Sequence, residues 1–145
     1  MKPLLLLPQL VAKLDRVLER VEPLLPKPSK PVDWTNTHAA LWVRQSYSGH
    51  LQAVGNTGRI TLQDVIGVDT QKEKVVKNTE QFVRGLPANN VLLTGSRGTG
   101  KSSLVQALLN EYSAQGLRVI QVDKSDLADL MAIVGAIAGE PYRFL

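Results

Sequence analysis

Residues 95–102 have the types and the spacing of a phosphate-binding loop. They fit the pattern G-x-x-x-x-G-K-[ST], known as Walker A, and read Gly95-Ser96-Arg97-Gly98-Thr99-Gly100-Lys101-Ser102. The three glycines leave room for backbone N–H groups to surround a triphosphate. Lys101 is able to reach the β- and γ-phosphates, and the Ser102 hydroxyl is a suitable Mg²⁺ ligand. The stretch therefore predicts a site for ATP and Mg²⁺, with Lys101 as the candidate catalytic residue.

Two other residues of this stretch have a less specific role. Arg97 is able to touch a phosphate, but a solvated loop arginine is the simpler interpretation. Ser103 follows the motif directly and is counted with the candidate cofactor-binding segment, without a phosphate contact of its own. The alternative for the whole stretch is a Gly-rich turn that matches by chance, and such a turn would require neither the lysine nor the serine.

The segments on either side of the loop suit this chemistry. Residues 91–94 are apolar or β-branched and predict a buried strand. After the loop, helical spacing is shown by Leu104, Val105, Leu108, Leu109 and Tyr112. This helix is expected to end near Gln115, with Gly116 closing it. Its N-terminal amides and positive dipole end would point at the phosphates.

Composition limits the possible classes of protein. At 145 residues the chain has the usual size of one domain. It has no cysteine, which excludes disulfides and thiolate metal sites and suits a cytoplasmic location. The net charge is +4, and most of the basic excess lies in residues 1–31. This excess is too small to predict nucleic-acid binding.

The N-terminal region predicts a helix followed by a linker. The first residues lack the apolar length of a signal peptide or a membrane span. Residues 9–22 form an amphipathic pattern that could dock on the main domain, pair with another chain or lie on a membrane, of which the first two are preferred. A Pro-rich linker follows, with Pro23, Pro26, Pro28 and Pro31. We therefore expect two parts, residues 1–31 and residues 32–145.

Residues 33–90 predict a mixture of helices and strands. A short helix is expected from Asp33 through residues 39–42, with Trp34 and Trp42 packed, and then two strands at 50–54 and 59–62. Asp69 is the expected N-cap of the next helix. The buried stripe of that helix comprises Val75, Val76, Thr79, Phe82 and Val83, and Gly85 is expected to end it.

The C-terminal third predicts a second strand, a helix and the start of a third strand. Residues 117–123 are the strand, and Ser125 or Asp126 is the expected cap of the helix. The apolar residues of that helix are Leu127, Leu130, Met131, Val134 and Ile137. Residues 143–145 are expected to begin the third strand.

Several stretches together resemble a family of bacterial AAA-type ATPases catalogued as a domain of unknown function. They comprise residues 64–72, 78–82, 85–93, the Walker A loop, 108–112 and 122–124. The resemblance covers residues 60–145, and more loosely 33–59. It implies an α/β fold of the P-loop NTPase type, a three-layer parallel sheet, here incomplete. It also implies an ATPase activity, and self-association into rings in full-length relatives.

The resemblance also implies an adenine pocket and further elements that do not occur here. An Ile-Gly or Val-Gly step before the first core helix lines the adenine in AAA-type proteins, which makes Val65, Ile66 and Gly67 the candidates. A strand-to-helix turn that only packs is the alternative. The family continues with an acidic Walker B strand, a sensor strand and a helical lid, and these do not follow Leu145. We therefore expect Mg-ATP binding, with hydrolysis needing those elements.

Two other functions fit the same sequence. In the other branch of P-loop proteins the second strand lies beside the phosphate-loop strand, and Asp123 would then be the Walker B acid of a small complete nucleotide kinase or GTPase-like switch. The guanine-reading Asn-Lys-x-Asp element of GTPases is not found. A non-enzymatic interaction fragment, acting through the N-terminal helix, is the third hypothesis.

Overall fold

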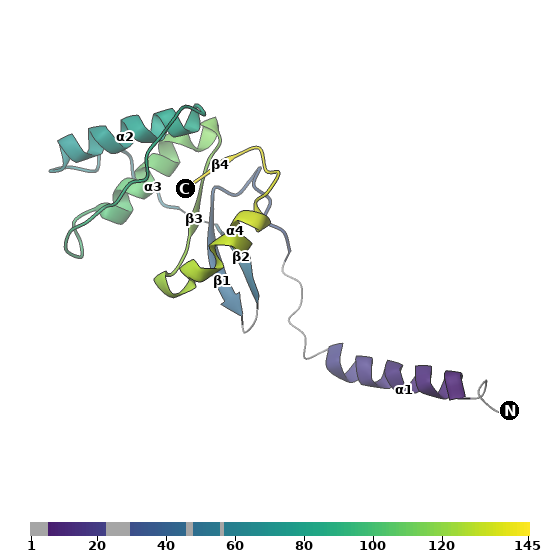
Figure 1. Ribbon diagram of the computed structural model, residues 1–145. Coiled ribbons are helices and arrows are strands. Elements are labelled where there is room, and N and C mark those ends of the chain that lie inside the picture. The colour runs from purple at the N-terminus through teal and green to yellow at the C-terminus, as the bar shows by residue number, and fades with distance from the viewer. Residues whose placement is uncertain (1–5, 23–29, 46–47, 56) are drawn as a thin grey trace. The chain divides into compact units, whose positions relative to one another are not determined.

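A computed structural model describes residues 6–22, 30–45, 48–55 and 57–145 (Figure 1). The chain clusters into two compact units that divide between Lys30 and Pro31. No helix in these ranges has the length and apolarity needed to cross a bilayer. The prolines expected to form the linker at positions 23, 26 and 28 lie outside the described residues.

The N-terminal unit contains one helix, α1 (Leu6–Val21), which confirms the predicted amphipathic helix. It begins three residues earlier than residue 9, because Pro8 falls in the first turn, where no intrahelical N–H bond is lost. Its apolar side chains from Leu10 to Val21 are all exposed. None of them belongs to either core cluster of the chain.

The second unit is built on a four-stranded sheet. Its order is β2 (Ser48–Val54), β1 (Ala39–Gln45), β3 (Leu117–Gln121) and β4 (Arg143–Phe144). The β1–β2 pair is antiparallel, whereas β1–β3 and β3–β4 are parallel. The predicted strands at 50–54 and 117–123, and the third strand starting at residue 143, are therefore confirmed, except that β3 ends at Gln121, two residues earlier than predicted.

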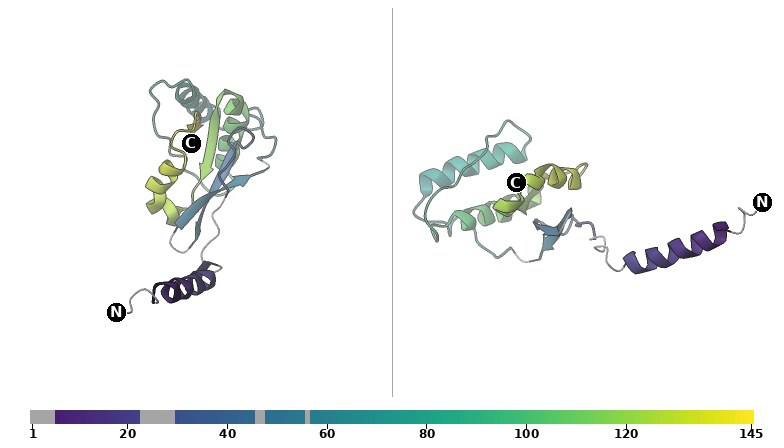
Figure 2. Two further views of the ribbon diagram at one scale, coloured as in Figure 1. Left: turned by 90° about the vertical axis from the view of Figure 1, so that its right-hand side faces the viewer. Right: turned by 60° about the horizontal axis from the view of Figure 1, so that its bottom comes forward.

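Helices cover both faces of this sheet (Figure 2). On one face lies α3 (Lys101–Tyr112), which continues into the 3₁₀ turn η2 (Ser113–Gln115), and α2 (Asp69–Val83) packs against α3. On the other lie the 3₁₀ helix η3 (Lys124–Asp129) and α4 (Leu130–Ala136). The mixed, three-layer α/β architecture agrees with the fold class expected of a partial AAA-type P-loop domain.

Two hydrophobic clusters hold these layers together. The first joins α3 to β3 through Leu104, Ala107, Leu108, Tyr112 and Leu117, with Val65 beside them and the apolar stripe of α2 packed against it. The second joins the hairpin to α4 through Trp34, Ala40, Trp42, Leu51 and Ile133. Because successive strand residues face opposite sides, Leu117 enters the first layer and Arg118 faces the other way. The predicted packing of the two tryptophans is confirmed.

The helix expected from Asp33 through residues 39–42 is wrong, since residues 39–42 belong to β1. The Asp33 carboxylate accepts hydrogen bonds from Thr35 N (3.0 Å) and from Asn36 Nδ2 (2.8 Å), which closes a turn instead of starting a helix. In β1 the side chains of Ala40 and Trp42 lie on one face and enter the second cluster. Tertiary packing therefore overrides the helical propensity of the two alanines.

The strand expected at residues 59–62 is also wrong. Asp64 Oδ2 accepts hydrogen bonds from Thr61 N and Thr61 Oγ1, both at 2.7 Å, and these bonds hold the segment in a turn. The Ile60 carbonyl accepts from Asn110 Nδ2 at 2.8 Å, so a side chain of α3 takes the place of a strand neighbour. The segment thereby ties α3 to the chain before α2.

Both predicted helix caps are displaced. The N-cap of α2 is Val68, and Asp69 is the first helical residue, where its carboxylate pairs with Lys72 Nζ at 3.0 Å. The helical segment after β3 is capped by Asp123, not by Ser125 or Asp126, because Asp123 accepts from Ser125 N at 2.9 Å. The glycines expected to end the two long helices are confirmed, with φ of +72° at Gly85 and +96° at Gly116.

The apolar residues expected on the last helix are divided between core and solvent. Leu127, Leu130, Met131 and Val134 are exposed, whereas Ile133 is buried in the second cluster and Ile137 packs against it. The segment begins as a 3₁₀ helix with three residues per turn, which rotates the faces that a regular α-helical spacing would predict.

Candidate functional site: a glycine loop at the start of α3

The loop ahead of α3 has the backbone shape of an anion cradle. Its three glycines have positive φ, of +138° at Gly95, +85° at Gly98 and +80° at Gly100. A side chain at these positions would strain the backbone, since L residues rarely adopt this region. Gly100 is the N-cap of α3, so the helix starts at Lys101 with its first amides free of intrahelical partners.

Lys101 holds its ammonium group inside the loop. Its Nζ donates to the Gly95 carbonyl at 2.9 Å, to the Ser96 carbonyl, and to Thr99 Oγ1 at 3.1 Å. Thr99 Oγ1 in turn donates to the Ser96 carbonyl at 2.9 Å. These three oxygen acceptors hold the positive charge of Lys101 within the glycine loop, next to the start of α3, and a cation beside a helix N-terminus suits a phosphate group.

The remaining predicted residues of the loop lie at the surface. Ser96, Arg97, Thr99 and Ser102 are exposed, and Ser103 is half-buried on the first turn of α3. Ser102 also lines a cavity of roughly 1120 Å³ between α2, α3 and the sheet. Its hydroxyl is thus free of the core and accessible to a metal ion bound with a nucleotide.

Residues 91–94 are not a strand, which corrects the prediction. They form no ladder with any described strand, and Leu92 is 86% exposed. A parallel strand requires a neighbour on at least one side, and β3 already has β1 on one side and β4 on the other. Of the four residues, Leu93 alone packs against the first core cluster, while Val91 and Leu93 both line the cavity beside the loop.

The approach to the loop is held by an asparagine clasp that the sequence analysis missed. Asn78 Nδ2 donates to the Asn89 carbonyl and Asn89 N donates to Asn78 Oδ1, both at 2.8 Å. These two bonds fasten the chain ahead of the loop to α2. An asparagine in a helix interior is unfavourable unless its side chain binds backbone elsewhere. The position of Asn78 inside a predicted helix was therefore the signal in the sequence that could have indicated such a contact.

The three candidate adenine contacts have different environments. Val65 is 5% exposed and belongs to the first core cluster, and its carbonyl accepts from Lys72 Nζ at 2.7 Å. Ile66 is 83% exposed, and Gly67 has φ of +77°. The turn therefore buries its first residue and presents the second to solvent, so Ile66 is the member with a side chain available for a ligand.

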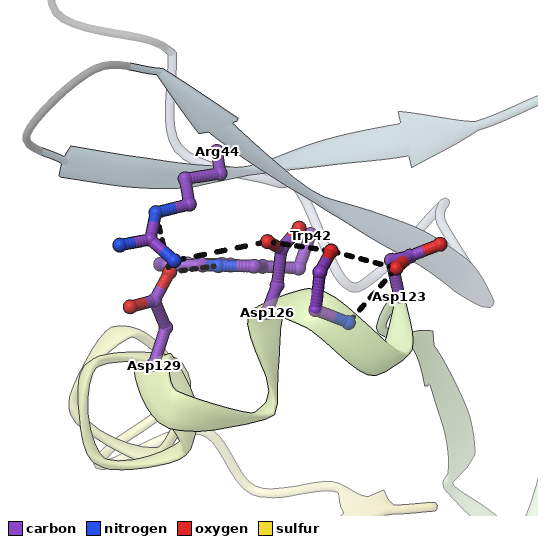
Figure 3. A network of polar contacts seen from close by, with 6 residues as sticks. Trp42, Arg44, Asp123, Asp126 and Asp129 are labelled. Atoms are coloured by element: carbon purple, nitrogen blue, oxygen red, sulfur yellow. Dashed lines mark hydrogen bonds and ion pairs between the residues drawn. The ribbon is translucent and has the colours of Figure 1, made fainter.

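Asp123, the alternative Walker B acid, is part of a different network (Figure 3). Its Oδ1 accepts from Ser125 N at 2.9 Å and from Ser125 Oγ at 2.7 Å. These bonds, the backbone one first, hold the pKa of the Asp123 carboxyl below its usual value. Next to it, Trp42 Nε1 donates to Asp129 Oδ2 at 3.2 Å, and Arg44 pairs with Asp126 and Asp129.

This network connects the hairpin to η3 and not to the glycine loop. Arg44 and Trp42 come from β1, and the three aspartates lie on or just before η3. Both edges of β3 are paired, so residues 91–94 have no place beside it. The arrangement that would make Asp123 a Mg²⁺ ligand next to the loop is therefore not formed.

Comparison with known proteins finds a family over most of the chain. The family model described as "Protein of unknown function (DUF815)" matches residues 35–145. This range contains the whole sheet, the glycine loop, the first hydrophobic cluster and every buried residue of the second cluster except Trp34. No solved structure gives a significant match.

Among curated proteins the chain is distantly similar to AAA-type ATPases. The replication factor C large subunit of Staphylothermus marinus is 36% identical over 66 residues, which are 45% of this chain and 15% of that protein. The ATP-dependent zinc metalloprotease FTSH 7, chloroplastic, of Oryza sativa subsp. japonica is 32% identical over 101 residues, 64% of this chain and 12% of that protein. The matches thus span less than a fifth of either relative.

Proposed function

This chain belongs to the family described as DUF815, a protein of unknown function, and on that premise we propose that it is an AAA-type module that binds Mg-ATP through residues 95–102. The observation that carries the proposal is the position of Lys101, whose ammonium group lies among three oxygens of the glycine loop. The distant similarity to AAA-type ATPases, one of them described as ATP-dependent, supports the same function.

Binding would use groups that the loop already holds in place. Lys101 would exchange its loop carbonyls for oxygens of the β- and γ-phosphates, and the amides that open α3 would donate to the same anion. Ser102 would ligate the Mg²⁺ that accompanies the triphosphate and neutralises part of its charge. Ile66, exposed on the turn before α2, is the proposed adenine contact, with Val65 and Gly67 shaping that turn.

Hydrolysis requires more than this cradle. In-line attack on the γ-phosphate needs an acid or amide that orients the water and a second group that stabilises the developing charge. The described residues assign neither, because Asp123 caps η3. We therefore propose that the chain binds Mg-ATP and by itself turns it over weakly or not at all. Its cysteine-free composition suits the cytoplasmic location included in this proposal.

Thermal unfolding with and without Mg-ATP tests the binding proposal. A ligand at 100 times its Kd stabilises the folded state by about 2.7 kcal/mol. For a chain of this size, this corresponds to a rise in midpoint of roughly 5–10 °C. Lys101→Ala should abolish the rise without lowering the midpoint of the free protein, because the Lys101 bonds lie in an exposed loop.

The controls separate a specific site from general charge effects. Lys74→Ala removes an exposed lysine of α2 and should keep the full shift. Chelation of Mg²⁺ should reduce the shift in the wild type. An equal shift in wild type and Lys101→Ala would refute the proposed site. A larger shift with GTP than with ATP would favour the GTPase-like alternative.

A further inference from the structure

The polar side chains of α1 are divided by sign on the two flanks of its apolar stripe. Successive residues of an α-helix are rotated by about 100°. If the angular position of Leu10 around the helix axis is set to zero, the six leucine and valine residues from Leu10 to Val21 lie between about −20° and 100°. On one side of the stripe Lys13 and Arg20 lie at about −60° and −80°, and on the other side Asp15 and Glu22 lie at about 140° and 120°. Arg16, at about −120°, and Glu19, at about 180°, continue the two sides toward the opposite face of the helix. The stripe thus has a basic flank on one side and an acidic flank on the other.

The apolar stripe is not covered by any other part of the N-terminal unit that the structure describes. Its members Leu10, Val11, Leu14, Val17, Leu18 and Val21 are each between 39% and 61% exposed. A helix of 16 residues is marginal in water unless its apolar face is covered. Some surface must therefore complete this face, and the charges beside it restrict which surface fits.

From this arrangement we infer that α1 associates in parallel, and in register, with α1 of a second copy of this chain. When two such helices face each other in parallel, the two-fold axis runs along them, and the basic flank of each helix meets the acidic flank of the other on both sides. In the antiparallel arrangement the axis is perpendicular to the helices, so basic meets basic and acidic meets acidic. Only the parallel arrangement is electrostatically complementary.

The heights of the charges along the helix agree with an in-register pair. With a rise of about 1.5 Å per residue, Lys13 lies within about 3 Å in height of Asp15 of a second copy. Arg20 lies within about 3 Å in height of Glu22 of that copy. Exposed ion pairs contribute about 0–1 kcal/mol each. The apolar stripe therefore supplies most of the affinity, and the charges determine orientation and register.

The same charges argue against a lipid surface as the partner. Helices that lie in an anionic membrane interface carry lysine and arginine on their polar face. Here one whole flank is acidic and would face the lipid headgroups. A second copy of α1 satisfies both flanks, whereas an anionic membrane satisfies one.

The experiment measures the mass of the full chain in solution by sedimentation equilibrium over a dilution series. We expect a mass of at least twice the monomer mass of 15.9 kDa, falling on dilution. Leu14→Glu with Leu18→Glu should give a monomer, and the matched control Ala12→Gln, on the opposite face, should not change the association. Lys101→Ala should associate as the wild type does, which separates this inference from the nucleotide site.

Charge exchange tests complementarity directly. One variant, with Asp15→Lys, Glu19→Lys and Glu22→Lys, makes both flanks basic. The other, with Lys13→Glu, Arg16→Glu and Arg20→Glu, makes both flanks acidic. Each variant alone should associate more weakly than the wild type, and an equimolar mixture should recover the association of the wild type. A mixture that associates no more tightly than either variant alone would overturn the inference.

Single cysteines report the orientation, because the chain has none of its own. Leu10→Cys should form disulfide-linked homodimers under mild oxidation. In a mixture of Leu10→Cys with Val21→Cys, mass spectrometry should find the homodimers and few mixed dimers, whereas an antiparallel pair would give mainly mixed dimers.

Two other results would also contradict the inference. A wild-type chain that stays monomeric at every concentration, and whose unfolding midpoint falls with Leu14→Glu and Leu18→Glu, would show that the stripe docks on its own chain. A monomer that binds phosphatidylglycerol vesicles through the stripe would identify a membrane partner.

Discussion

Arg118 is a buried cation that is satisfied by carbonyl groups. It is 3% exposed, and its guanidinium donates to the Trp34 carbonyl from Nε (2.9 Å) and Nη2 (2.8 Å). Its Nη1 donates to the carbonyls of Ser113 and Leu117 at 2.9 and 2.8 Å, and its Cζ lies 4.0 Å from the centre of the Tyr142 ring. Among the described residues no carboxylate forms an ion pair with it. The side chain thus links β3 to the segment before β1 and to the end of α3.

Replacement of Arg118 by methionine should destabilise the second unit. The change keeps an apolar stem but leaves the Trp34 carbonyl without either of its guanidinium donors, and such charge-assisted bonds contribute about 1.5–3 kcal/mol. We expect a loss of about 2–3 kcal/mol in the free energy of unfolding, measured from urea midpoints. Arg84→Met, at an exposed position, should stay within about 0.5 kcal/mol. Equal effects of the two changes would contradict the structural role of Arg118.

The titration of Asp123 distinguishes a helix cap from a metal ligand. Because its pKa is lowered in the folded protein by the backbone and hydroxyl donors of Ser125, its stabilising contribution is present above the unfolded pKa and is lost as the pH falls through the folded value. Ser125→Ala removes the hydroxyl donor and should raise the pKa of Asp123 toward its usual value, observed by carboxyl ¹³C NMR. Mg-ATP should leave this titration unchanged, and a shift of the Asp123 signal on adding Mg-ATP would support its role as the Walker B acid.

At the level of elements, local patterns predicted helices better than strands. The ends of α2 and α3 follow from Gly85 and Gly116, because a left-handed helix end favours glycine on local grounds. Whether residues 39–45 or residues 91–94 form a strand depends on neighbours that are far away in sequence. Ala39 to Leu41 pair with residues 119–121 of β3, and nothing in their local composition indicates this partner.

The glycine loop was predictable, whereas its surroundings were not. Gly95, Gly98, Gly100 and Lys101 form a motif whose residue types follow directly from phosphate binding, so the pattern alone identifies the candidate site. The clasp between Asn78 and Asn89 joins α2 to the segment before the loop through two hydrogen bonds of the Asn78 side chain, and the spacing of residues does not reveal such bonds. The exposed state of Ile66 likewise depends on how the turn enters α2.

The segment before the loop provides a direct test of its structure. Leu92 is exposed, whereas Leu93 packs against the first core cluster. Leu92→Lys should therefore change the free energy of unfolding by no more than about 0.5 kcal/mol, and Leu93→Lys should cost about 1–3 kcal/mol, because it places a charge against the core. Urea unfolding of the two variants measures both values. A large loss for Leu92→Lys would show that residues 91–94 are buried in a sheet after all.

At the level of the whole molecule, the chain separates into two units with separate proposed roles. Both hydrophobic clusters consist of residues after Pro31, and the glycine loop lies between α2 and α3 of the same unit. The apolar stripe and the two charged flanks proposed for self-association all lie on α1 or at Glu22. Parallel association of two α1 helices would bring the second units of the two copies to the same end of the helix pair, which raises their local concentration.

Deletion of residues 1–30 should therefore separate association from nucleotide binding. The shortened chain keeps every buried side chain of both clusters, so its urea midpoint should match that of a monomeric full-length variant, Leu14→Glu with Leu18→Glu. It should keep the Mg-ATP-dependent rise in thermal midpoint and lose the self-association seen by sedimentation. The full-length monomeric variant is the proper reference, because association would itself stabilise the wild type by mass action. Loss of cooperative unfolding after the deletion would instead show that the helix completes the fold of the second unit.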